Sequence, residues 1–268
     1  GALWLSHGLP GRFPAEAQKV ASYLDGDGDG STGHDYYRYG KCFMTALDWD
    51  LQTFDFRDCL AQVPGRPTYL LLGDSHAAHL WWGLDKAYPD ANVMQATATG
   101  CKPVLHQRPR QHPGCTRLMT YILEDYLVHH HVDALLLEGH WEADDLPSLS
   151  ATLDWLRAKQ VRVILFGPML QYDSPLPRLL AMSLRDGDPG MPAAHRVPEF
   201  WTLDDRMAAL ARDTWKVPYV SLIHLLCKGQ SCVQYAEAGV PLQSDYGHLT
   251  GDGSVLLAKK LRDEAHVQ

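Results

Sequence analysis

The chain has 268 residues, of which 46% are hydrophobic and 21% are charged, and its formal net charge is −8. This length and composition are typical of a globular protein with one large domain or two small ones. The negative charge argues against a nucleic-acid binder and a basic membrane-surface protein, and the lack of an apolar run of about 18 residues argues against a membrane span.

The first 66 residues show no regular alternation of strand and helix patterns. Residues 14–24 begin with a proline and predict one short helix, whereas the aspartate- and glycine-rich residues 25–33 predict a turn-rich segment. We therefore expect residues 1–66 to form an N-terminal extension or linker that packs on a main domain of residues 67–268.

From residue 68 the pattern changes, and apolar runs alternate with helical patterns. The runs are continuous, as expected for strands buried on both faces of a sheet. Five strand-then-helix units predict an α/β fold, a three-layer αβα sandwich around a five-stranded parallel sheet. Residues 171–198 are rich in Pro, Gly and Asp and predict a long loop over the carboxyl edge of this sheet. The expected strands are 68–72, 92–96, 132–137, 161–166 and 218–221, and the expected helices are 76–88, 117–130, 146–159, 203–215 and 253–265.

Six cysteines fall into three local pairs, and no pair has the C-x-x-C spacing of a zinc or redox motif. Six cysteines allow 15 connectivities, but short loops need the least ordering of the chain on closure. We expect three disulfides and an oxidising compartment, with six reduced, unrelated cysteines as the alternative. The pairs are Cys42/Cys59, Cys101/Cys115 and Cys227/Cys232.

The first expected strand ends in Gly73-Asp74-Ser75-His76, and a helical pattern follows. Open parallel sheets bind their ligands at the carboxyl ends of the strands. The Ser75 hydroxyl is therefore expected at that edge, beside the positive end of a helix, which suits a nucleophile. The alternative is that Asp74 or Ser75 only caps the helix.

Asp245 and His248 stand three residues apart after the last expected strand. A nucleophilic serine needs a base that removes its proton, and that base needs an acid that orients it. One turn with the spacing Asp-x-x-His presents both side chains toward one point. A fold that brings the first and last strand ends together would assemble Ser75, His248 and Asp245.

These motifs resemble the SGNH hydrolase family, with Gly73-Asp74-Ser75 in its first sequence block and Asp245-x-x-His248 in its last. The flanking stretches are similar to the SGNH domains fused to membrane acyltransferases of family 3, which modify O-antigens and other polysaccharides. The resemblance implies a flavodoxin-like SGNH fold, with Ser75 as nucleophile, His248 as general base and Asp245 as its orienting acid. The matching stretches are "GDSHAAHL", "TGCKPVL", "LLLEGHW", "LFGPMLQYDSPLPRLL", "LLCKGQSCV" and "DYGHLTGDG".

The resemblance also implies an oxyanion hole that includes the backbone N–H groups of Ser75 and Gly100. A glycine after a strand lets the backbone approach a bound group closely, which supports Gly100 independently. Many family members carry an asparagine after the third strand, but this chain has Glu138-Gly139-His140-Trp141 there. Either His140 supplies an N–H group, or the hole has two donors and His140 is a structural histidine held by Glu138 or Glu142.

Other motifs are interpreted as structural, and no cofactor or metal is expected. Residues 25–30 imitate the start of a calcium loop, but the twelfth position is Tyr36, which lacks the closing carboxylate. Three histidines at 129–131 end an expected helix, where cationic side chains suit the dipole. Trp81 and Trp82 are expected in the core, and core packing is also favoured for two tryptophans that would otherwise line a sugar site, Trp141 and Trp201.

The resemblance implies an O-acetyltransferase domain that acts on hydroxyls of a cell-envelope polysaccharide through an acyl-serine intermediate. Its acyl group would come from a fused or partner membrane acyltransferase, and the domain would be periplasmic, as part of an inner-membrane protein, with no nucleic-acid partner. A carbohydrate acetyl esterase with the same triad is the first alternative. The second is a glycan-binding module whose triad is vestigial.

Overall fold

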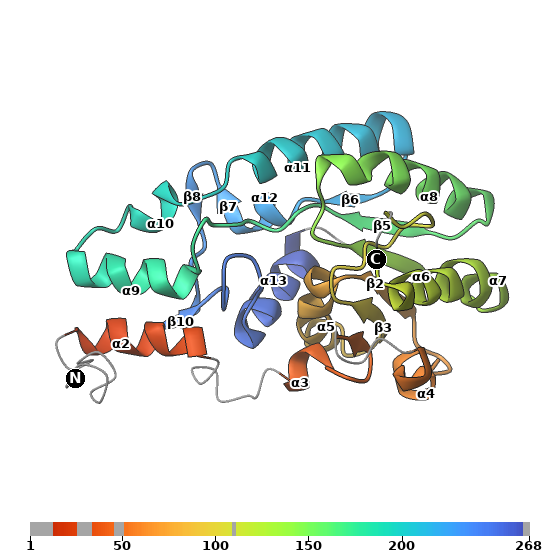
Figure 1. The fold of residues 1–268 in the computed structure, drawn as a ribbon, viewed down its shortest axis with the longest axis horizontal. Coiled ribbons are helices and arrows are strands. Elements are labelled where there is room, and N and C mark those ends of the chain that lie inside the picture. The colour runs from red at the N-terminus through yellow and green to blue at the C-terminus, as the bar shows by residue number, and fades with distance from the viewer. Residues whose placement is uncertain (1–12, 26–33, 46–50, 109–110, 265–268) are drawn as a thin grey trace.

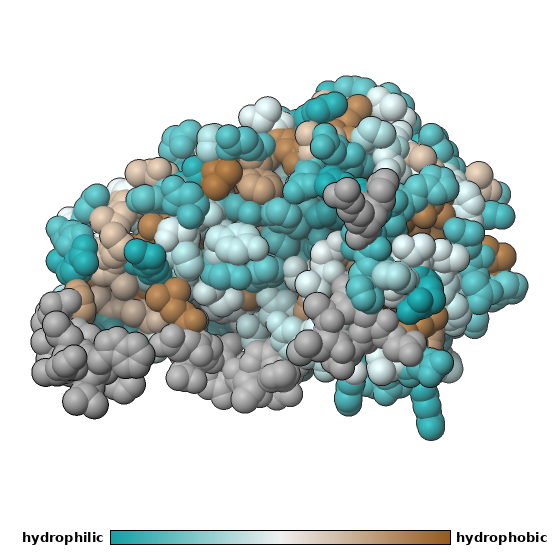
Figure 2. All heavy atoms as spheres, viewed as in Figure 1, coloured by the Kyte–Doolittle hydropathy of each residue, from teal (hydrophilic) through white to brown (hydrophobic). Residues whose placement is uncertain are grey.

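The computed structural model describes residues 13–25, 34–45, 51–108 and 111–264. Residues 26–30, which make up most of the pattern that imitates a calcium loop, lie outside these ranges. Within the described ranges, no helix is long and apolar enough to cross a membrane. On the face seen in Figure 2, polar residues cover most of the surface, and hydrophobic residues appear as separate small groups.

The main sheet has parallel strands in the order β1-β3-β2-β4-β5-β6 (Figure 1). The expected α/β class with a parallel sheet is confirmed, and the five expected strands are β2 to β6. The sheet has a sixth strand, β1, which pairs with β3 at one edge and comes from the first 66 residues. Because these two residues fall within the expected N-terminal extension, no strand was expected there. The strands are β1 (Phe43–Met44), β2 (Thr68–Gly73), β3 (Asn92–Ala98), β4 (Ala134–Glu138), β5 (Val163–Phe166) and β6 (Tyr219–Val220).

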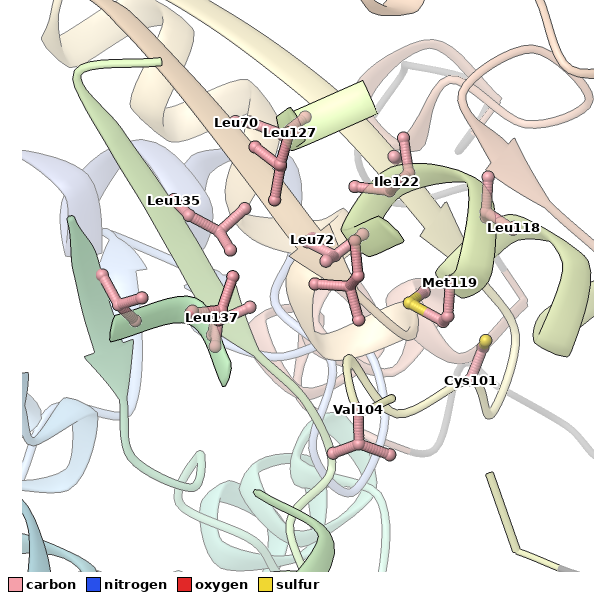
Figure 3. Packing of buried hydrophobic residues seen from close by; sticks show 14 of the residues in the cluster. Leu70, Leu72, Cys101, Val104, Leu118, Met119, Ile122, Leu127, Leu135 and Leu137 are labelled. Atoms are coloured by element: carbon pink, nitrogen blue, oxygen red, sulfur yellow. The ribbon is translucent and has the colours of Figure 1, made fainter. Parts of the chain in front are cut away.

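Hydrophobic side chains of the central strands alternate between two separate cores, one on each face of the sheet. In β2, Leu70 and Leu72 belong to one core and Leu71 to the other, because successive strand residues point to opposite faces. Figure 3 shows Leu70 and Leu72 beside Leu135 and Leu137 of the neighbouring strand. The continuous apolar runs are therefore explained by helices that cover both faces.

The helices form the two outer layers. The first core includes residues of α6 (Pro113–Thr120), the following π-helical turn (Tyr121–Tyr126), α7 (Leu127–His129), α8 (Leu146–Ala158) and α11 (Glu199–Leu210). The second core includes residues of α5 (Ser75–Ala87), α12 (Leu222–Leu226) and α13 (Gly251–Glu264). The expected helices are present, although two of them contain a π-helical segment, Tyr121–Tyr126 and Ala211–Trp215.

The expectation of a long loop at residues 171–198 is wrong, because this segment contains α9 (Leu176–Asp186) and α10 (Met191–Ala194). Pro175 precedes α9, Pro177 lies in its first turn, and Gly187 ends it in a left-handed conformation. Leu176, Leu179 and Leu180 have the spacing of one helix face and are buried in the second core.

The N-terminal residues pack on this sandwich at two places. The helix α2 (Ala15–Ala21) buries Ala17 and Val20 and lies beside α9 (Figure 1). Further along, β1 joins the main sheet, so the first 66 residues contribute to the central layer, while their separation as a domain stays a prediction. The other short elements are Ser22–Asp25, α3 (His34–Tyr37), Leu51–Thr53, α4 (Phe56–Cys59), Ala143–Asp145, β7 (Cys227–Lys228), β8 (Ser231–Cys232), β9 (Tyr235–Glu237) and β10 (Val240–Pro241).

All three local cysteine pairs are disulfide-bonded. The bridge Cys42–Cys59 joins the segment of β1 to α4. A second bridge, Cys101–Cys115, connects the loop after β3 to α6, and the third, Cys227–Cys232, closes the hairpin of β7 and β8. Two of the bridges therefore hold segments close to the carboxyl edge of the sheet.

Candidate active site

The turn between β2 and α5 carries Ser75. The side chain of Asp74 caps α5 by accepting the backbone N–H of His76 at 2.9 Å. A Cβ atom on Gly73 would lie 1.7 Å from the carbonyl oxygen of Glu138 in the neighbouring strand, so only glycine fits there. Ser75 is thus the first residue of α5, where backbone N–H groups have no acceptor within the helix.

The structure brings Ser75, His248 and Asp245 together, although Ser75 and His248 are 173 residues apart in the sequence. Ser75 Oγ lies 2.8 Å from Nε2 of His248, and Nδ1 of His248 lies 2.7 Å from Oδ2 of Asp245. When Nδ1 carries the proton and donates it to Asp245, Nε2 is left as the acceptor for the Ser75 hydroxyl. This is the arrangement that a serine nucleophile requires.

Asp245 is held by its own turn as well as by the imidazole. Its Oδ1 accepts the backbone N–H groups of Gly247 at 2.8 Å and His248 at 2.7 Å. Burial by itself raises the pKa of the Asp245 carboxyl, but the hydrogen bonds from His248 and Gly247 outweigh it, and the net pKa is lowered. The carboxylate therefore stays ionised and fixes the orientation of the imidazole.

Two histidines on α5 lie behind the triad, and the sequence analysis gave neither of them a role. His76 and His79 are almost fully buried, and the His76 ring centroid lies 4.8 Å from that of His248. Burial lowers the pKa of both imidazoles well below the usual value, and the nearby His248 adds to this effect. Their spacing of three residues, on one helix face, is the signal that would have identified the pair.

A buried ion pair connects the turn that carries Ser75 to the loops that follow β3 and β4. Asp74 Oδ2 lies 3.2 Å from Lys102 Nζ and accepts the backbone N–H of His140 at 2.9 Å. Lys102 also donates to the carbonyl oxygen of His140. Lys102 lies in one of the stretches that resemble the family. A lysine at this position of the sequence does not by itself indicate that its side chain reaches Asp74. The ion pair fixes the loop of His140 relative to Ser75.

Gly100 and His140, two of the expected oxyanion donors, have different surroundings. Gly100 is exposed, has a φ of 63° and lines a cavity together with Lys102. The backbone N–H of His140 is donated to Asp74, and the His140 ring centroid lies 4.9 Å from that of His76. Among the described residues, the bonds that hold His140 thus come from neither Glu138 nor Glu142, the partners expected for a structural histidine.

The two glutamates have other environments. Glu138 is fully buried, and no hydrogen bond to its carboxyl oxygens is found within the described ranges. Burial raises the pKa of this carboxyl well above its usual value, and the negative charge of Asp74 raises it further. Glu142 instead pairs with Arg108 at 2.8 Å. The roles of Gly100 and His140 in an oxyanion hole therefore remain predictions.

The hydrogen bonds that join Ser75, His248 and Asp245 involve none of the tryptophans or surface histidines considered in the sequence analysis. Trp141 is fully buried and donates its indole N–H to the carbonyl oxygen of Phe166 at 3.0 Å, so it is a core residue, as expected. Trp81 and Trp82 are half-buried and pack against the hydrophobic cores, and Arg38 and Lys86 cover their rings. The half-buried Trp201 lies near the ring of His224, and His129 pairs with Asp125 on its own helix.

Asp204, Asp205 and His224 form the group within the described residues whose side chains lie close enough together to hold a metal. The carboxylate of Asp204 already accepts hydrogen bonds from the hydroxyls of Tyr219 at 2.6 Å and Ser221 at 2.5 Å. These hydrogen bonds join α11 to the segment of β6, and this contact explains why the side chains of the group lie together.

The family model of the SGNH domain fused to AT3 domains matches residues 41–263. The chain belongs to this family. No curated protein matches the sequence of this SGNH domain. Among solved structures, the periplasmic domain of the lipopolysaccharide acetyltransferase from Salmonella ser. Paratyphi A is similar, with a TM-score of 0.75 and 19% identity over 92% of this chain and 97% of that one.

Two other structures are similar at lower scores. The C-terminal catalytic domain of peptidoglycan O-acetyltransferase A from Streptococcus pneumoniae has a TM-score of 0.43 and 12% identity, over 75% of this chain and 93% of that one. A carbohydrate acetylesterase family member from Sinorhizobium meliloti has a TM-score of 0.43 and 13% identity, over 75% of this chain and 97% of that one. Because the Salmonella domain is only 19% identical to this chain, the similarity between them establishes a shared fold.

Proposed function

We propose that this SGNH domain transfers acetyl groups to hydroxyls of a cell-envelope glycan through an acyl-enzyme on Ser75. The observation that carries the proposal is the continuous hydrogen-bond chain from Ser75 Oγ through the imidazole of His248 to Asp245. His248 takes the Ser75 proton as Oγ attacks the acyl carbonyl carbon, and then returns a proton to the leaving group. Asp245 orients the imidazole and stabilises its positive charge.

The oxyanion of the tetrahedral intermediate needs donors at the end of the sheet where Ser75 stands. The backbone N–H of Ser75 at the N-terminus of α5 supplies one donor and the positive end of the helix dipole. Gly100 is the proposed second donor, because its loop follows β3, the strand beside β2. His140 would supply a donor only through its ring, since its backbone N–H is committed to Asp74.

The family and the cysteines support the proposed acceptor and compartment. Membership in a family of SGNH domains fused to AT3 domains supports an acyl group delivered by a membrane acyltransferase. The acetyltransferase function of the similar Salmonella domain supports a polysaccharide acceptor. Three disulfides support an oxidising compartment, which for a bacterial envelope enzyme is the periplasm.

The competing function is a carbohydrate acetyl esterase, in which water replaces the glycan hydroxyl as the acceptor. The cavity beside Ser75 is open to solvent, which favours hydrolysis when no acceptor is bound. We therefore expect the purified domain to hydrolyse small acetyl esters slowly and to acetylate glycans efficiently only together with its membrane acyltransferase. Rapid Ser75-dependent glycan acetylation from a soluble donor, without a membrane component, would contradict this expectation.

The decisive test is the hydrolysis of p-nitrophenyl acetate by the purified domain and its Ser75→Ala variant. Loss of the nucleophile is expected to lower kcat by a factor on the order of 10⁴ or more, with an unchanged circular dichroism spectrum. The matched control is Ser231→Ala, an exposed serine in the β7–β8 hairpin, which should retain wild-type activity. Full activity of Ser75→Ala would refute the assignment.

A fluorophosphonate probe separates an enzyme from a glycan-binding module with a vestigial triad. Labelling of the wild type at Ser75, found by peptide mass spectrometry and absent in Ser75→Ala, is expected of an enzyme. An unlabelled wild-type protein would favour the binding module. Mass spectrometry of envelope glycans from cells with and without an intact Ser75 then identifies the acceptor.

A further inference from the structure

A cavity of about 320 Å³ lies directly beside the candidate triad. This volume is at the lower end of the roughly 300–1,000 Å³ that small-molecule sites span. Ser75 and His248 line it, so a group bound there is next to the atoms that carry out the chemistry. The rest of the lining is strongly aromatic, and the aromatic residues are Tyr36, Tyr37, Tyr39 and Phe43.

This aromatic wall is built by a short segment that runs from α3 into β1. Arg38 has a φ of 60°, a left-handed conformation that is rare outside glycine, and it turns the chain between two tyrosines. Its guanidinium lies 4.4 Å from the ring centroid of Trp81 and pairs with Asp58 at 3.0 Å, which holds the turn. The rings of Tyr37 and Tyr39 stack with centroids 5.0 Å apart and an angle of 24°.

The wall has a rigid base and an accessible part. Tyr37 is 5% exposed, and its ring centroid lies 6.4 Å from that of His248. Tyr39 is only half-buried, and it packs on Phe43 with the ring centroids 5.1 Å apart. An aromatic ring that is fixed by its neighbours but reaches the cavity offers a flat apolar surface at a small entropic cost.

The chemistry of this lining fits a sugar ring. A pyranose carries C–H groups on one face and hydroxyls around its edge, so it pairs with an aromatic face on one side and polar groups on the other. The hydroxyl-bearing Thr99 and Ser244 also line the cavity, and Thr99 is exposed. The lining therefore has both the apolar and the polar parts that such a ligand requires.

The charged side chains that line the cavity favour some classes of sugar over others. The lining within the described part of the chain contains no Lys or Arg, whereas it contains Asp245, whose carboxyl has a lowered pKa and stays ionised. The chain also has a net charge of −8. An anionic sugar would therefore meet a carboxylate without a cation to offset its own charge, and a neutral sugar would not.

We infer that this aromatic wall is the acceptor subsite, and that it binds a neutral pyranose ring on Tyr39 with one hydroxyl directed at Ser75. The inference rests on the proposed function. In the transfer step the sugar oxygen forms a bond to the acyl carbon, and the bond from that carbon to Ser75 Oγ breaks. The hydroxyl proton passes to His248 Nε2 and from there to Ser75 Oγ, so the enzyme returns to its starting state.

All three tyrosines of the wall precede residue 41, where the match to the family begins. The triad, in contrast, lies wholly within the matched residues. A specificity element that stands outside the shared sequence can vary while the chemistry stays the same. The N-terminal segment therefore supplies the tyrosines of this proposed subsite, in addition to its structural role at β1.

The test compares two substrates that share the triad but differ in their use of the wall. A mono-O-acetylated methyl hexopyranoside is deacetylated with its sugar in the acceptor position, because the sugar leaves along the path by which the acceptor enters. p-Nitrophenyl acetate has no sugar. The measured quantity is the ratio of kcat/KM for the sugar ester to kcat/KM for p-nitrophenyl acetate, determined for the acetylated glucoside, galactoside, mannoside and glucuronoside.

Tyr39→Leu is expected to lower this ratio about three- to tenfold for the best neutral substrate, and Tyr39→Phe should keep the wild-type ratio because it keeps the ring. The matched control is Tyr235→Leu, another half-buried tyrosine, which lies on β9 and lines a different cavity. An unchanged ratio for Tyr39→Leu, or a better ratio for the glucuronoside than for the neutral esters, would overturn the inference.

A binding measurement separates this inference from the proposed chemistry. Saturation-transfer NMR with the unacetylated methyl hexopyranosides and Ser75→Ala protein reports contact without turnover. Contact by a neutral glycoside that Tyr39→Leu abolishes supports the subsite, even if Ser75 proves not to be the nucleophile. Absence of contact by every neutral glycoside overturns the subsite, whereas Ser75-dependent ester hydrolysis would still support the enzyme.

Discussion

His76 is expected to make the stability of the fold fall as the pH is lowered below neutral. Its imidazole is almost fully buried, and burial together with the neighbouring His248, His79, His140 and Lys102 lowers its pKa well below the usual value. In the unfolded chain the same imidazole titrates near pH 6.5. As the pH falls through 6.5, the unfolded state therefore binds a proton that the folded state does not, and the folded state loses stability.

The size of this effect follows from proton linkage. Each pKa unit corresponds to 1.36 kcal/mol, and between pH 7.5 and 5.5 an imidazole with a pKa of 6.5 gains about one unit of proton-binding free energy. A histidine that stays neutral in the fold thus costs about 1.4 kcal/mol of stability over this range. His79 has a pKa lowered by the same main cause, burial, so it should add a similar amount.

Urea unfolding of the wild type and His76→Gln at pH 7.5, 6.5 and 5.5 isolates this contribution. The stability difference, wild type minus variant, should decrease by about 1.4 kcal/mol from pH 7.5 to 5.5, because the contributions of Glu138 and Asp245 are common to both proteins. His131→Gln is the control, since the His131 side chain is 85% exposed. A difference that does not change with pH would refute the reasoning.

Three further predictions concern the frame around the site. Gly73→Ala should cost more than about 3 kcal/mol or prevent folding, because its Cβ would overlap a backbone carbonyl of β4; thermal unfolding measures this, and a stable variant would contradict it. Lys102→Met should cost about 3–5 kcal/mol by leaving the carboxylate of Asp74 buried without a cation, and adding Asp74→Asn should recover most of the loss in urea unfolding. Replacing Cys42 and Cys59 by serine should cost about 3 kcal/mol for a loop of 17 residues, and a loss below about 1 kcal/mol would show that the bridge constrains the unfolded chain little.

Sequence patterns predicted the central architecture because a buried parallel strand and an amphipathic helix leave local signatures. Strands β2 to β6 appeared as apolar runs of the right length, since both of their faces are covered. The helix α9 was missed because Pro and Gly were interpreted as loop residues, whereas Pro175 and Pro177 stand at its start and Gly187 at its end. Strand β1 was missed because it lies outside the strand-then-helix alternation and joins the sheet only by pairing with β3.

The candidate triad was predictable because its residues lie in two short motifs that have a chemical meaning of their own. Asp245 and His248 share one turn, and the spacing between them is a local property of the chain. The cysteine pairs were predictable for the same reason, because each bridge closes a short loop. These features depend on neighbours in the sequence, so the amino-acid order by itself determined them.

Tertiary structure alone decided which distant groups support and surround the site. Lys102 reaches Asp74, the N–H of His140 is committed to that same carboxylate, and Tyr39 stands beside a triad formed by residues far along the chain. A lysine or tyrosine side chain has the same intrinsic properties at any position, and it acquires a partner only when the sheet brings separate loops to one edge. The candidate triad is therefore predictable from local sequence, whereas the aromatic wall beside it depends on long-range packing.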